Sequence, residues 1–441
     1  MTNFIKIKNK INSYDKKIQV SGDKSISIRC VLLASQAIGK SKIYNLLESE
    51  DVSNSLKSIK KLGIKYKKYK NYYEIEGLGI NGFKKKKFIE INAGNSGTFA
   101  RLILGFLVNY PGVVKISGDK SLSKRDFSRI TIPLSQFGAN IVNANNSLPV
   151  KISGTEYLRP IDYIEKLGSA QCKSSIMFAA LKTPGITKVK AKKSRNHTEI
   201  LLKNLKVPIK ISNKKNYDLF EIKGPVNFSG FEYVVPGDIS SSAFFLVMTL
   251  LSKNSKLKII NVNINKSRTG IIKILNKMNA SILLNNKRTY KGELIADIVV
   301  KNCNNLIAIN CPKNLNSSAI DEFLVIFLVA AKAKGVSTFK DLGELNKKES
   351  PRLDIAINFL RKIGVKTIRK GNDLKIYGNP NLNLNKDYVV KNFRKDHRIF
   401  MMSCVAALTL GGKWTIHDKD SVNSSFPRFF EIIKQLGAKL N

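Results

Sequence analysis

Residues 21–29 read Ser-Gly-Asp-Lys-Ser-Ile-Ser-Ile-Arg and predict a tight turn that opens a helix. Gly22 permits the bend, and Asp23 is a favoured residue for capping a helix N-terminus. Apolar residues at helical spacing follow, which indicates that this helix packs into a core. The unpaired N–H groups of a helix start, beside Lys24 and Arg29, are suited to bind an anion.

The same kind of opening recurs along the chain. Small polar residues precede an apolar helix pattern in five further places, which are Gly94–Thr98, Gly168–Gln171, Gly237–Ser242, Ser317–Asp321 and Lys395–Arg398. A second signature ends a helix pattern six times, with its third residue at Gly63, Gly138, Lys206, Asn279, Gly364 and Gly437. We interpret this residue as a left-handed helix C-cap, and we expect a strand after each one. The regular period indicates six copies of one structural unit.

Each unit reads as polar turn, apolar helix, strand, second helix, cap and strand, which predicts an α/β fold. The first helix is apolar on nearly all sides and should be buried, whereas the second is amphipathic. Six units divide naturally into two domains of three, residues 1–20 plus 237–441 and residues 21–236. We therefore expect residues 1–20 to pair with the second half, with crossovers near Val20–Ser21 and Val235–Gly237. A cleft between two such lobes is the expected ligand site.

Composition narrows the functional classes. The chain has 441 residues and a formal net charge of +44, which suits nucleic acid, an anionic surface or anionic small substrates. Heavy use of Lys, Asn and Ile favours compositional drift for most lysines, and no zinc-finger or RNA-binding signature accompanies them. The apolar runs are shorter than the roughly 18 residues that cross a bilayer, and the N-terminus lacks a signal core, so we expect a cytoplasmic protein. Five scattered cysteines and three histidines predict free thiols, no metal site and no cofactor.

Several stretches carry groups for binding anions and moving protons. In Lys347–Arg352, Arg352 can clamp an anion, Lys348 can neutralise another, and Glu349 can shuttle protons; a solvated charge cluster on a loop is the alternative. Asp321-Glu322 places carboxylates before an apolar run, which is costly unless they are paired or catalytic. The remaining candidates are equally compatible with helix caps, turns or charged faces, and they are Lys24, Ser25, Arg29, Gly97, Arg125, Ser169, Ala170, Gln171, Ser194 and Arg398. Together they favour a transfer between two small anionic substrates.

The chain resembles the EPSP synthase family over essentially its whole length. The matching stretches, in the family's order, are SGDKSISIR, GNSGTFARL, GDKSLSKR, SAQCKSS, SRNHTE, PGDISSSAFF, SRTGI, IDEF, KKESPRL, DHRI and SFPRFF. The resemblance implies a two-lobed inverse α/β barrel of six βαβαββ repeats, three per domain. It also implies transfer of the enolpyruvyl group of phosphoenolpyruvate to the 5-hydroxyl of 3-phosphoshikimate, with release of phosphate and without a cofactor.

The resemblance further implies roles for individual residues. Asp321 and Glu349 would transfer protons, and Lys24 would act in catalysis and touch both substrates. Residues implied to bind 3-phosphoshikimate are Lys24, Ser25, Arg29, Ser169, Ala170, Gln171, Ser194, Asp321 and Lys348. Those implied to bind phosphoenolpyruvate are Lys24, Gly97, Arg125, Gln171, Arg352 and Arg398. The partners are thus small anionic substrates, with no need for nucleic acid or membrane, and we expect a monomer.

Some positions depart from the family's usual pattern. Pro351 replaces an acidic residue before Arg352, and because proline fixes φ and removes a donor it bears on the aim of Arg352. Asp126 stands where proline is common, and Ser424 stands where some members have lysine. Gly97 is the small residue found in family members that the inhibitor glyphosate blocks, so our hypothesis is that glyphosate inhibits this protein.

Two alternative functions remain. One is the sister enolpyruvyl transferase that acts on UDP-N-acetylglucosamine, which would be expected to carry a loop cysteine, but no cysteine lies between Cys30 and Cys172. The other is a basic nucleic-acid-binding protein. The intact charged residues argue against a catalytically inactive relative.

Overall fold

The computed structural model describes residues 3–440 and divides the chain into two compact units. Unit 1 comprises Met1–Ser21, Pro236–Tyr290 and Leu294–Asn441, and unit 2 comprises Gly22–Val235 and Lys291–Glu293. Residues 1, 2 and 441, which the predicted domain ranges include, lie outside the described residues. The tripeptide Lys291–Glu293 groups with unit 2, although the sequence analysis placed it in the domain of residues 237–441.

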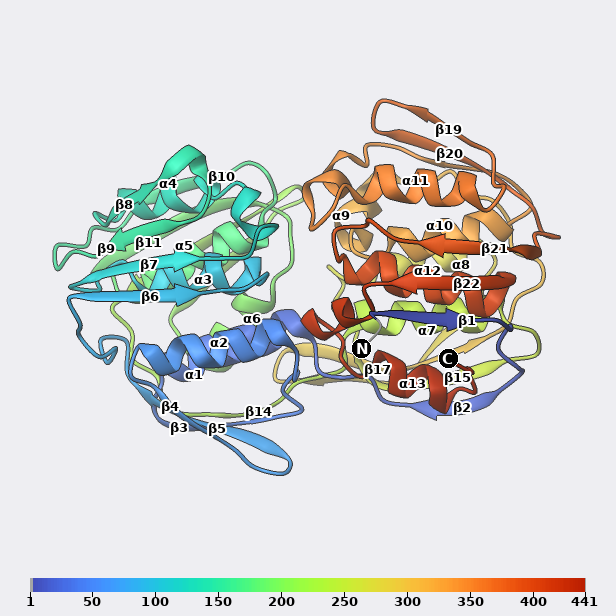
Figure 1. Ribbon diagram of the computed structural model, residues 1–441. Helices are drawn as coiled ribbons and strands as arrows, with labels where there is room; N and C mark the ends of the chain where they lie inside the picture. Colours follow the sequence, from blue (N-terminus) through green and yellow to red (C-terminus); the bar gives the residue numbers. More distant parts are fainter. Residues whose placement is uncertain (1–2, 441) are drawn as a thin grey trace. The chain divides into compact units, whose positions relative to one another are not determined.

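Unit 2 contains three four-stranded sheets that share one topology (Figure 1). In each sheet the first strand pairs in parallel with the second, and the remaining pairs are antiparallel. In sheet order, the strands are β14 (Glu232–Val234), β3 (Ile38–Tyr44), β5 (Tyr72–Leu78) and β4 (Lys65–Lys68); β6 (Phe88–Asn92), β7 (Val113–Ser117), β9 (Val150–Ser153) and β8 (Asn140–Asn143); and β10 (Asp162–Glu165), β11 (Gly185–Lys192), β13 (Tyr217–Gly224) and β12 (Ile209–Asn213). This shared pairing pattern is the structural counterpart of the sequence repeat, although β14 follows the other strands of its sheet along the chain, whereas β6 and β10 precede theirs.

Unit 1 also contains three sheets within the described residues, and its N-terminal strands join two of them. In sheet order, the strands are β16 (Ile282–Tyr290), β17 (Glu293–Lys301), β15 (Lys256–Asn263) and β2 (Asp15–Ile18); β18 (Gly335–Phe339), β20 (Asp373–Gly378) and β19 (Thr367–Lys370); and β1 (Phe4–Ile7), β22 (Gly411–His417) and β21 (Leu384–Val390). Because β1 pairs with β22 and β2 pairs with β15, the predicted pairing of residues 1–20 with the second half is confirmed.

Six helices form the cores of the units. They are α1 (Lys24–Gln36), α3 (Gly97–Phe106) and α5 (Ala170–Ala180) in unit 2, and α7 (Ile239–Leu251), α10 (Phe323–Lys332) and α12 (His397–Leu410) in unit 1. Every residue of α10 from Phe323 to Ala331 is buried, which confirms the prediction for the apolar helices. In unit 1, α7, α10 and α12 pack against one another, and each large apolar side chain buried there contributes about 1.5–3 kcal/mol.

The second helix of each repeat is α2 (Glu50–Lys61), α4 (Ser128–Gln136), α6 (His197–Asn204), α8 (Gly270–Lys277), α11 (Arg352–Lys362) or α13 (Phe429–Gln435). Short helices are α9 (Asn316–Ala319) and the 3₁₀ segments η1 (Leu122–Lys124), η2 (Ala144–Asn146), η3 (Lys313–Leu315), η4 (Gly343–Lys347) and η5 (Lys419–Ser424). Every helix between residues 3 and 440 falls short of the length and apolar character that a bilayer crossing needs.

The six predicted C-cap residues all adopt the left-handed conformation. Their φ angles range from 58° at Lys206 to 109° at Gly138, which confirms the prediction at every copy. A strand follows the first five caps, but the described chain after Gly437 forms none. The prediction of a strand there is wrong, and β1 pairs with β22 in that repeat's sheet.

Side chains cap five of the six core helices, as their openings predict. The capping residues accept from backbone N–H groups one turn or less ahead, and they are Asp23, Ser96, Ser169, Asp238 and Asp396. Helix α10 differs, because Glu322 occupies its N-cap position without a side-chain cap. The carboxylate of Glu322 is thereby left for other contacts.

Candidate active site

In unit 2, the start of α1 presents two of the predicted cations. The Lys24 Nζ lies 2.9 Å from Asp51 Oδ2, on α2. The Arg29 side chain is 3% exposed and donates from Nη1 to the Ser25 carbonyl over 3.0 Å. This contact curls the guanidinium back over its own helix turn, so the first turn of α1 positions both predicted substrate-binding groups.

Hydroxyl groups from two other helices hold the Arg29 guanidinium. Its Nε donates to Thr198 Oγ1 on α6 at 2.7 Å, and its Nη2 donates to Ser174 Oγ on α5 at 3.2 Å. The two hydroxyl oxygens lie 2.6 Å apart and bond each other. Arg29 therefore has its orientation set by three elements, α1, α5 and α6.

A second group in unit 2 joins α3 to α5. The Arg101 Nη1 donates to Gln171 Oε1 at 2.7 Å, and Gln171 Nε2 donates to Thr98 Oγ1 at 2.9 Å. The sequence analysis did not assign Arg101 to the site. Its position one helix turn after Gly97 was the available signal.

The cation Arg125 lies over the start of α3. Its Nη2 donates to Asn95 Oδ1 at 2.8 Å. A Cβ built on Gly97 would lie 3.2 Å from Arg125 Nη1, so this helix start and the guanidinium are close neighbours. A guanidinium at a helix N-terminus is a suitable anion site.

Ser169, Ala170 and Ser194 lie in the same unit. The Ser169 hydroxyl accepts from the Cys172 backbone N–H at 3.2 Å, so it caps α5, and Ala170 is the first residue of that helix. Within residues 3–440, the buried Ser194 hydroxyl oxygen has no hydrogen-bond partner. Buried hydroxyls are normally bonded, so Ser194 is suited to bond a ligand.

In unit 1, Arg352 is the centre of a carboxylate network. Its Nε lies 2.9 Å from Asp396 Oδ2, its Nη1 lies 3.4 Å from Asp321 Oδ1, and its Nη2 pairs with Glu349. The alternative of a solvated charge cluster does not hold for this residue, because Arg352 begins α11 and is only 1% exposed. The sequence could not show the burial, since it depends on partners 31 and 44 residues away.

Opposite charges in this network stabilise the ionised forms of Arg352 and Asp396. Burial by itself lowers the pKa of Arg352, but Asp396, Glu349 and Asp321 outweigh burial and raise it above its ordinary value. Burial likewise raises the pKa of Asp396, yet the Arg352 guanidinium holds it below its ordinary value. The Ser350 hydroxyl also donates to Asp396 Oδ2 at 2.8 Å. Arg352 and Asp396 are therefore a buried, hydrogen-bonded ion pair.

Two further predicted cations contact Asp321. The Lys348 Nζ lies 3.5 Å from Asp321 Oδ1, and Arg398 Nη1 donates to the Asp321 carbonyl at 2.8 Å. The backbone N–H of Arg398 donates to Asp396 Oδ1 at 2.9 Å. Unit 1 thus brings together five of the predicted site residues, which are Asp321, Lys348, Glu349, Arg352 and Arg398.

The buried carboxyl of Glu322 is a neighbour that the sequence analysis did not assign to the site. It accepts a hydrogen bond from the Ser240 hydroxyl, which also accepts from Arg268 Nη2 at 2.7 Å. Burial first and the Asp321 carboxylate second raise the pKa of Glu322, against the opposing effect of Arg398 and Arg268. The sequence feature that could have pointed to Glu322 was the acidic pair at residues 321–322, which precedes an apolar helix.

Two departures from the family's pattern have structural outcomes. Pro351, with φ of −71°, occupies the N-cap position of α11, where its missing N–H is tolerated. The Ser424 hydroxyl donates to the Ser421 carbonyl at 2.9 Å and lies 3.4 Å from Nδ1 of His397. Pro351 is thus compatible with the network around Arg352.

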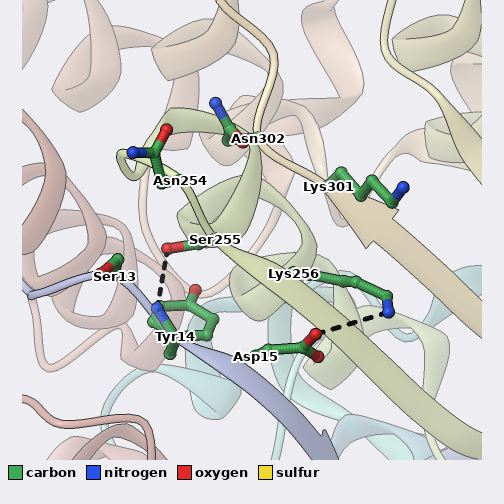
Figure 2. A pocket seen from close by; sticks show the side chains of 8 residues that line it. All are labelled: Ser13, Tyr14, Asp15, Asn254, Ser255, Lys256, Lys301 and Asn302. Atoms are coloured by element: carbon green, nitrogen blue, oxygen red, sulfur yellow. Dashed lines mark hydrogen bonds and ion pairs between the residues drawn. The ribbon is translucent and has the colours of Figure 1, made fainter.

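A surface pocket in unit 1 lies at residues outside the predicted set. Its lining residues are Ser13, Tyr14, Asp15, Asn254, Ser255, Lys256, Lys301 and Asn302. Figure 2 shows the Asp15–Lys256 ion pair and the bond from the Tyr14 backbone to Ser255. We find no group of three or more His, Cys, Asp or Glu residues suited to a metal among residues 3–440.

The comparisons with known proteins agree with this geometry. A family model described as EPSP synthase (3-phosphoshikimate 1-carboxyvinyltransferase) matches residues 8–433. The chain belongs to the EPSP synthase family. Membership identifies the chain as an enzyme of the shikimate pathway with 3-phosphoshikimate 1-carboxyvinyltransferase activity.

Individual EPSP synthases and an enolpyruvyl transferase are similar along nearly the whole chain. The 3-phosphoshikimate 1-carboxyvinyltransferase of Ruthia magnifica subsp. Calyptogena magnifica is 38% identical over 98% of this chain and 97% of its own. The solved EPSP synthase from Acinetobacter baumannii has a TM-score of 0.88 at 32% identity and covers 100% of this chain and 99% of its own. The enolpyruvyl transferase NikO from Streptomyces tendae has a TM-score of 0.78 at 14% identity over 99% of this chain and 98% of its own, so it shows the shared α/β fold alone.

Proposed function

We propose that the two residue groups described above act together on phosphoenolpyruvate and 3-phosphoshikimate. In the reaction, the methylene carbon of phosphoenolpyruvate gains a proton and the 5-hydroxyl of 3-phosphoshikimate attacks. The tetrahedral adduct then loses phosphate and a proton to restore the alkene. The observation that carries the proposal is the Arg352 network, in which two carboxylates, Asp321 and Glu349, lie beside an anion-binding guanidinium.

Binding of 3-phosphoshikimate is assigned mainly to unit 2. Its phosphate and hydroxyls would bond the side chains or helix-start groups of Lys24, Ser25, Arg29, Ser169, Ala170, Gln171 and Ser194, with Asp321 and Lys348 from unit 1. The buried Ser194 hydroxyl and the clamped Arg29 support this assignment. A site that hydrogen-bonds a hydroxyl rejects analogues that lack it.

Binding of phosphoenolpyruvate is assigned to cations of both units. Arg125 beside Gly97 offers a guanidinium and a helix start, and Arg352 and Arg398 offer two more guanidinium groups. Lys24 and Gln171 would touch both substrates. Arginine pairs with carboxylate and phosphate in a two-pronged geometry that orients the anion as well as attracting it.

Proton transfer is assigned to Asp321 and Glu349, with Lys24 as the cation beside the reacting atoms. Both carboxylates contact Arg352, so protonation of one changes the electrostatic field at the other. Lys348 lies next to Asp321 and favours its ionised form. We also propose that the protein is a cytoplasmic monomer whose domains are residues 1–20 plus 237–441 and residues 21–236.

The test is phosphate release by the purified protein. Release should require both phosphoenolpyruvate and 3-phosphoshikimate, and mass spectrometry should identify the enolpyruvyl product. Release with UDP-N-acetylglucosamine in place of 3-phosphoshikimate would favour the sister activity. Salt-sensitive retention of DNA without turnover would favour nucleic-acid binding and contradict the proposal.

A further inference from the structure

A three-residue segment in the hairpin of β16 and β17 belongs to unit 2. The segment Lys291–Glu293, which we call the strap, groups with unit 2 although the residues on both sides of it group with unit 1. Lys291 and Gly292 form the turn between β16 and β17, and Glu293 is the first residue of β17. The chain therefore enters unit 2 a second time, at a place where the sequence analysis expected no crossover.

Each residue of the strap contacts unit 2. The Lys291 ammonium donates to the Glu232 carbonyl and lies 5.9 Å from the centre of the Tyr233 ring, on β14. Gly292 has φ of +87°, and a Cβ built on it would lie 2.9 Å from Ile200 Cγ2, on α6. Glycine is thus required at position 292 by both backbone conformation and close approach.

The strongest contact joins Glu293 to the first residue of α6. Nδ1 of His197 lies 2.6 Å from Glu293 Oε1, so the imidazole donates and the carboxylate accepts, and both side chains are fully buried. Removing one partner of such a buried pair leaves the other polar group without its bond, which is costly. The pair therefore fixes where α6 begins relative to the strap.

The beginning of α6 is also what holds Arg29. Thr198 follows His197, and its hydroxyl accepts from Arg29 Nε at 2.7 Å. The strap also lies near α1: the pKa of the Cys30 thiol, raised mainly by burial, responds to the charges of Arg29, Glu293 and Lys291. A continuous set of contacts thus leads from Glu293 through His197 and Thr198 to Arg29.

We propose that Glu293, acting through His197, is a positioning residue for Arg29 and so sets the affinity for 3-phosphoshikimate. It touches no substrate; it holds the α6 residue that orients the guanidinium. The inference rests on the proposed function, because it takes 3-phosphoshikimate as the ligand of Arg29. Small displacements of a binding group can cost up to about 100-fold in rate, so the effect should be measurable.

The test measures binding of 3-phosphoshikimate by calorimetry without phosphoenolpyruvate, together with the KM of each substrate. Glu293→Ala should raise the Kd and the KM for 3-phosphoshikimate about tenfold, as loss of one hydrogen bond to a charged group predicts. The KM for phosphoenolpyruvate should change less than about twofold. Glu293→Gln keeps an acceptor for His197 and should recover most of the affinity.

Two further variants separate positioning from general stability. Gly292→Ala places a methyl group against Ile200 without changing a charge, and it should also weaken 3-phosphoshikimate binding. This variant replaces Glu293→Ala in the test if Glu293→Ala does not fold. Lys182→Met replaces a buried lysine that contacts Asn109 and the Ile80 carbonyl, and it should change the Tm without changing that Kd. A Kd unchanged in both strap variants overturns the inference. Absence of 3-phosphoshikimate binding or turnover in the unmodified protein would instead refute the proposed function.

Discussion

Two buried arginines, one in each unit, are held in different ways. Arg29 in unit 2 donates to two hydroxyl oxygens and a backbone carbonyl. Arg352 in unit 1 contacts three carboxylates, those of Asp396, Glu349 and Asp321. Their exposed fractions are 3% and 1%, so burial does not distinguish them.

Neutral oxygen atoms orient the Arg29 guanidinium, whereas carboxylates balance the charge of Arg352. A lost hydrogen bond to a charged group costs about 1.5–3 kcal/mol, whereas breaking a buried ion pair costs about 3–5 kcal/mol because a charge is left uncompensated. The hydroxyls around Arg29 orient its guanidinium, which under the proposed function binds an anionic ligand. The carboxylates around Arg352 balance a buried charge and so stabilise unit 1, and under the proposed function two of them also transfer protons.

The largest effect is expected at Asp396. Asp396→Ala should lower the free energy of unfolding by about 3–5 kcal/mol, because Arg352 loses the most deeply buried of its three counter-ions. Urea denaturation measures this loss. The matched control is Asp420→Ala, whose exposed pair with Lys395 should contribute no more than about 1 kcal/mol. Equal losses in the two variants would contradict the distinction.

The same pair has a predicted pH dependence. The native pKa of Asp396 lies below its ordinary value of 3.8, so its stabilisation is present above pH 3.8 and is lost as the pH falls through the native pKa. The difference in stability between the wild type and Asp396→Ala should therefore shrink in strong acid. A constant difference across that range would show that Asp396 acts without its charge.

Replacement of Glu349 tests whether a carboxylate that contacts Arg352 transfers protons. Glu349→Gln keeps the shape of a residue that contacts Arg352 but removes its basicity. We expect kcat to fall about 10²- to 10⁴-fold, as for a lost general acid or base, with little change in either KM. Steady-state phosphate release measures both constants, and an unchanged kcat would remove Glu349 from this role.

In unit 2, replacing Arg125 tests whether a guanidinium that donates to the Asn95 side-chain amide binds phosphoenolpyruvate. Arg125→Ala should raise the KM for phosphoenolpyruvate by about tenfold or more, because one charge-assisted bond to the anion is lost. The exposed Lys120→Ala is the control for a general reduction of positive charge. An effect confined to 3-phosphoshikimate would mean that Arg125 serves the other substrate.

The smallest effect is expected where a hydroxyl holds an arginine. Thr198→Val is nearly isosteric and removes one acceptor of Arg29, so the loss of stability should be about 1.5–3 kcal/mol by urea denaturation. The Kd for 3-phosphoshikimate should rise several-fold in calorimetry. A loss of stability as large as that of Asp396→Ala would erase the comparison between the two units.

Local patterns predicted much of the fold. The C-cap residues, including the non-glycine Lys206 and Asn279, were found because the left-handed conformation restricts which residues can end a helix. The core helices followed from their apolar composition. The partners of Arg352 and the strap could not be found this way, because residues such as Asp396 and His197 meet them only through the tertiary fold.

Among the site residues, sequence similarity and geometry contribute different knowledge. Similarity supplied the residue types and their order, while the structure shows which of them contact one another within a unit. Arg101 and Glu322 are two residues near the predicted site that neither similarity nor local pattern assigned to it. Their neighbours Gly97 and Asp321 were recognised, but the bond from Arg101 to Gln171 and the bond from Ser240 to Glu322 depend on packing between helices.

The pairing of β1 with β22 has a consequence for synthesis of the chain on the ribosome. His417, the partner of Phe4, emerges roughly 400 residues after Phe4 does. Unit 2 lacks only the strap once Val235 has emerged, whereas unit 1 waits until β22 has emerged. Since distant contacts form slowly and domains fold as units, we expect residues 22–235 to acquire their structure before β1 does.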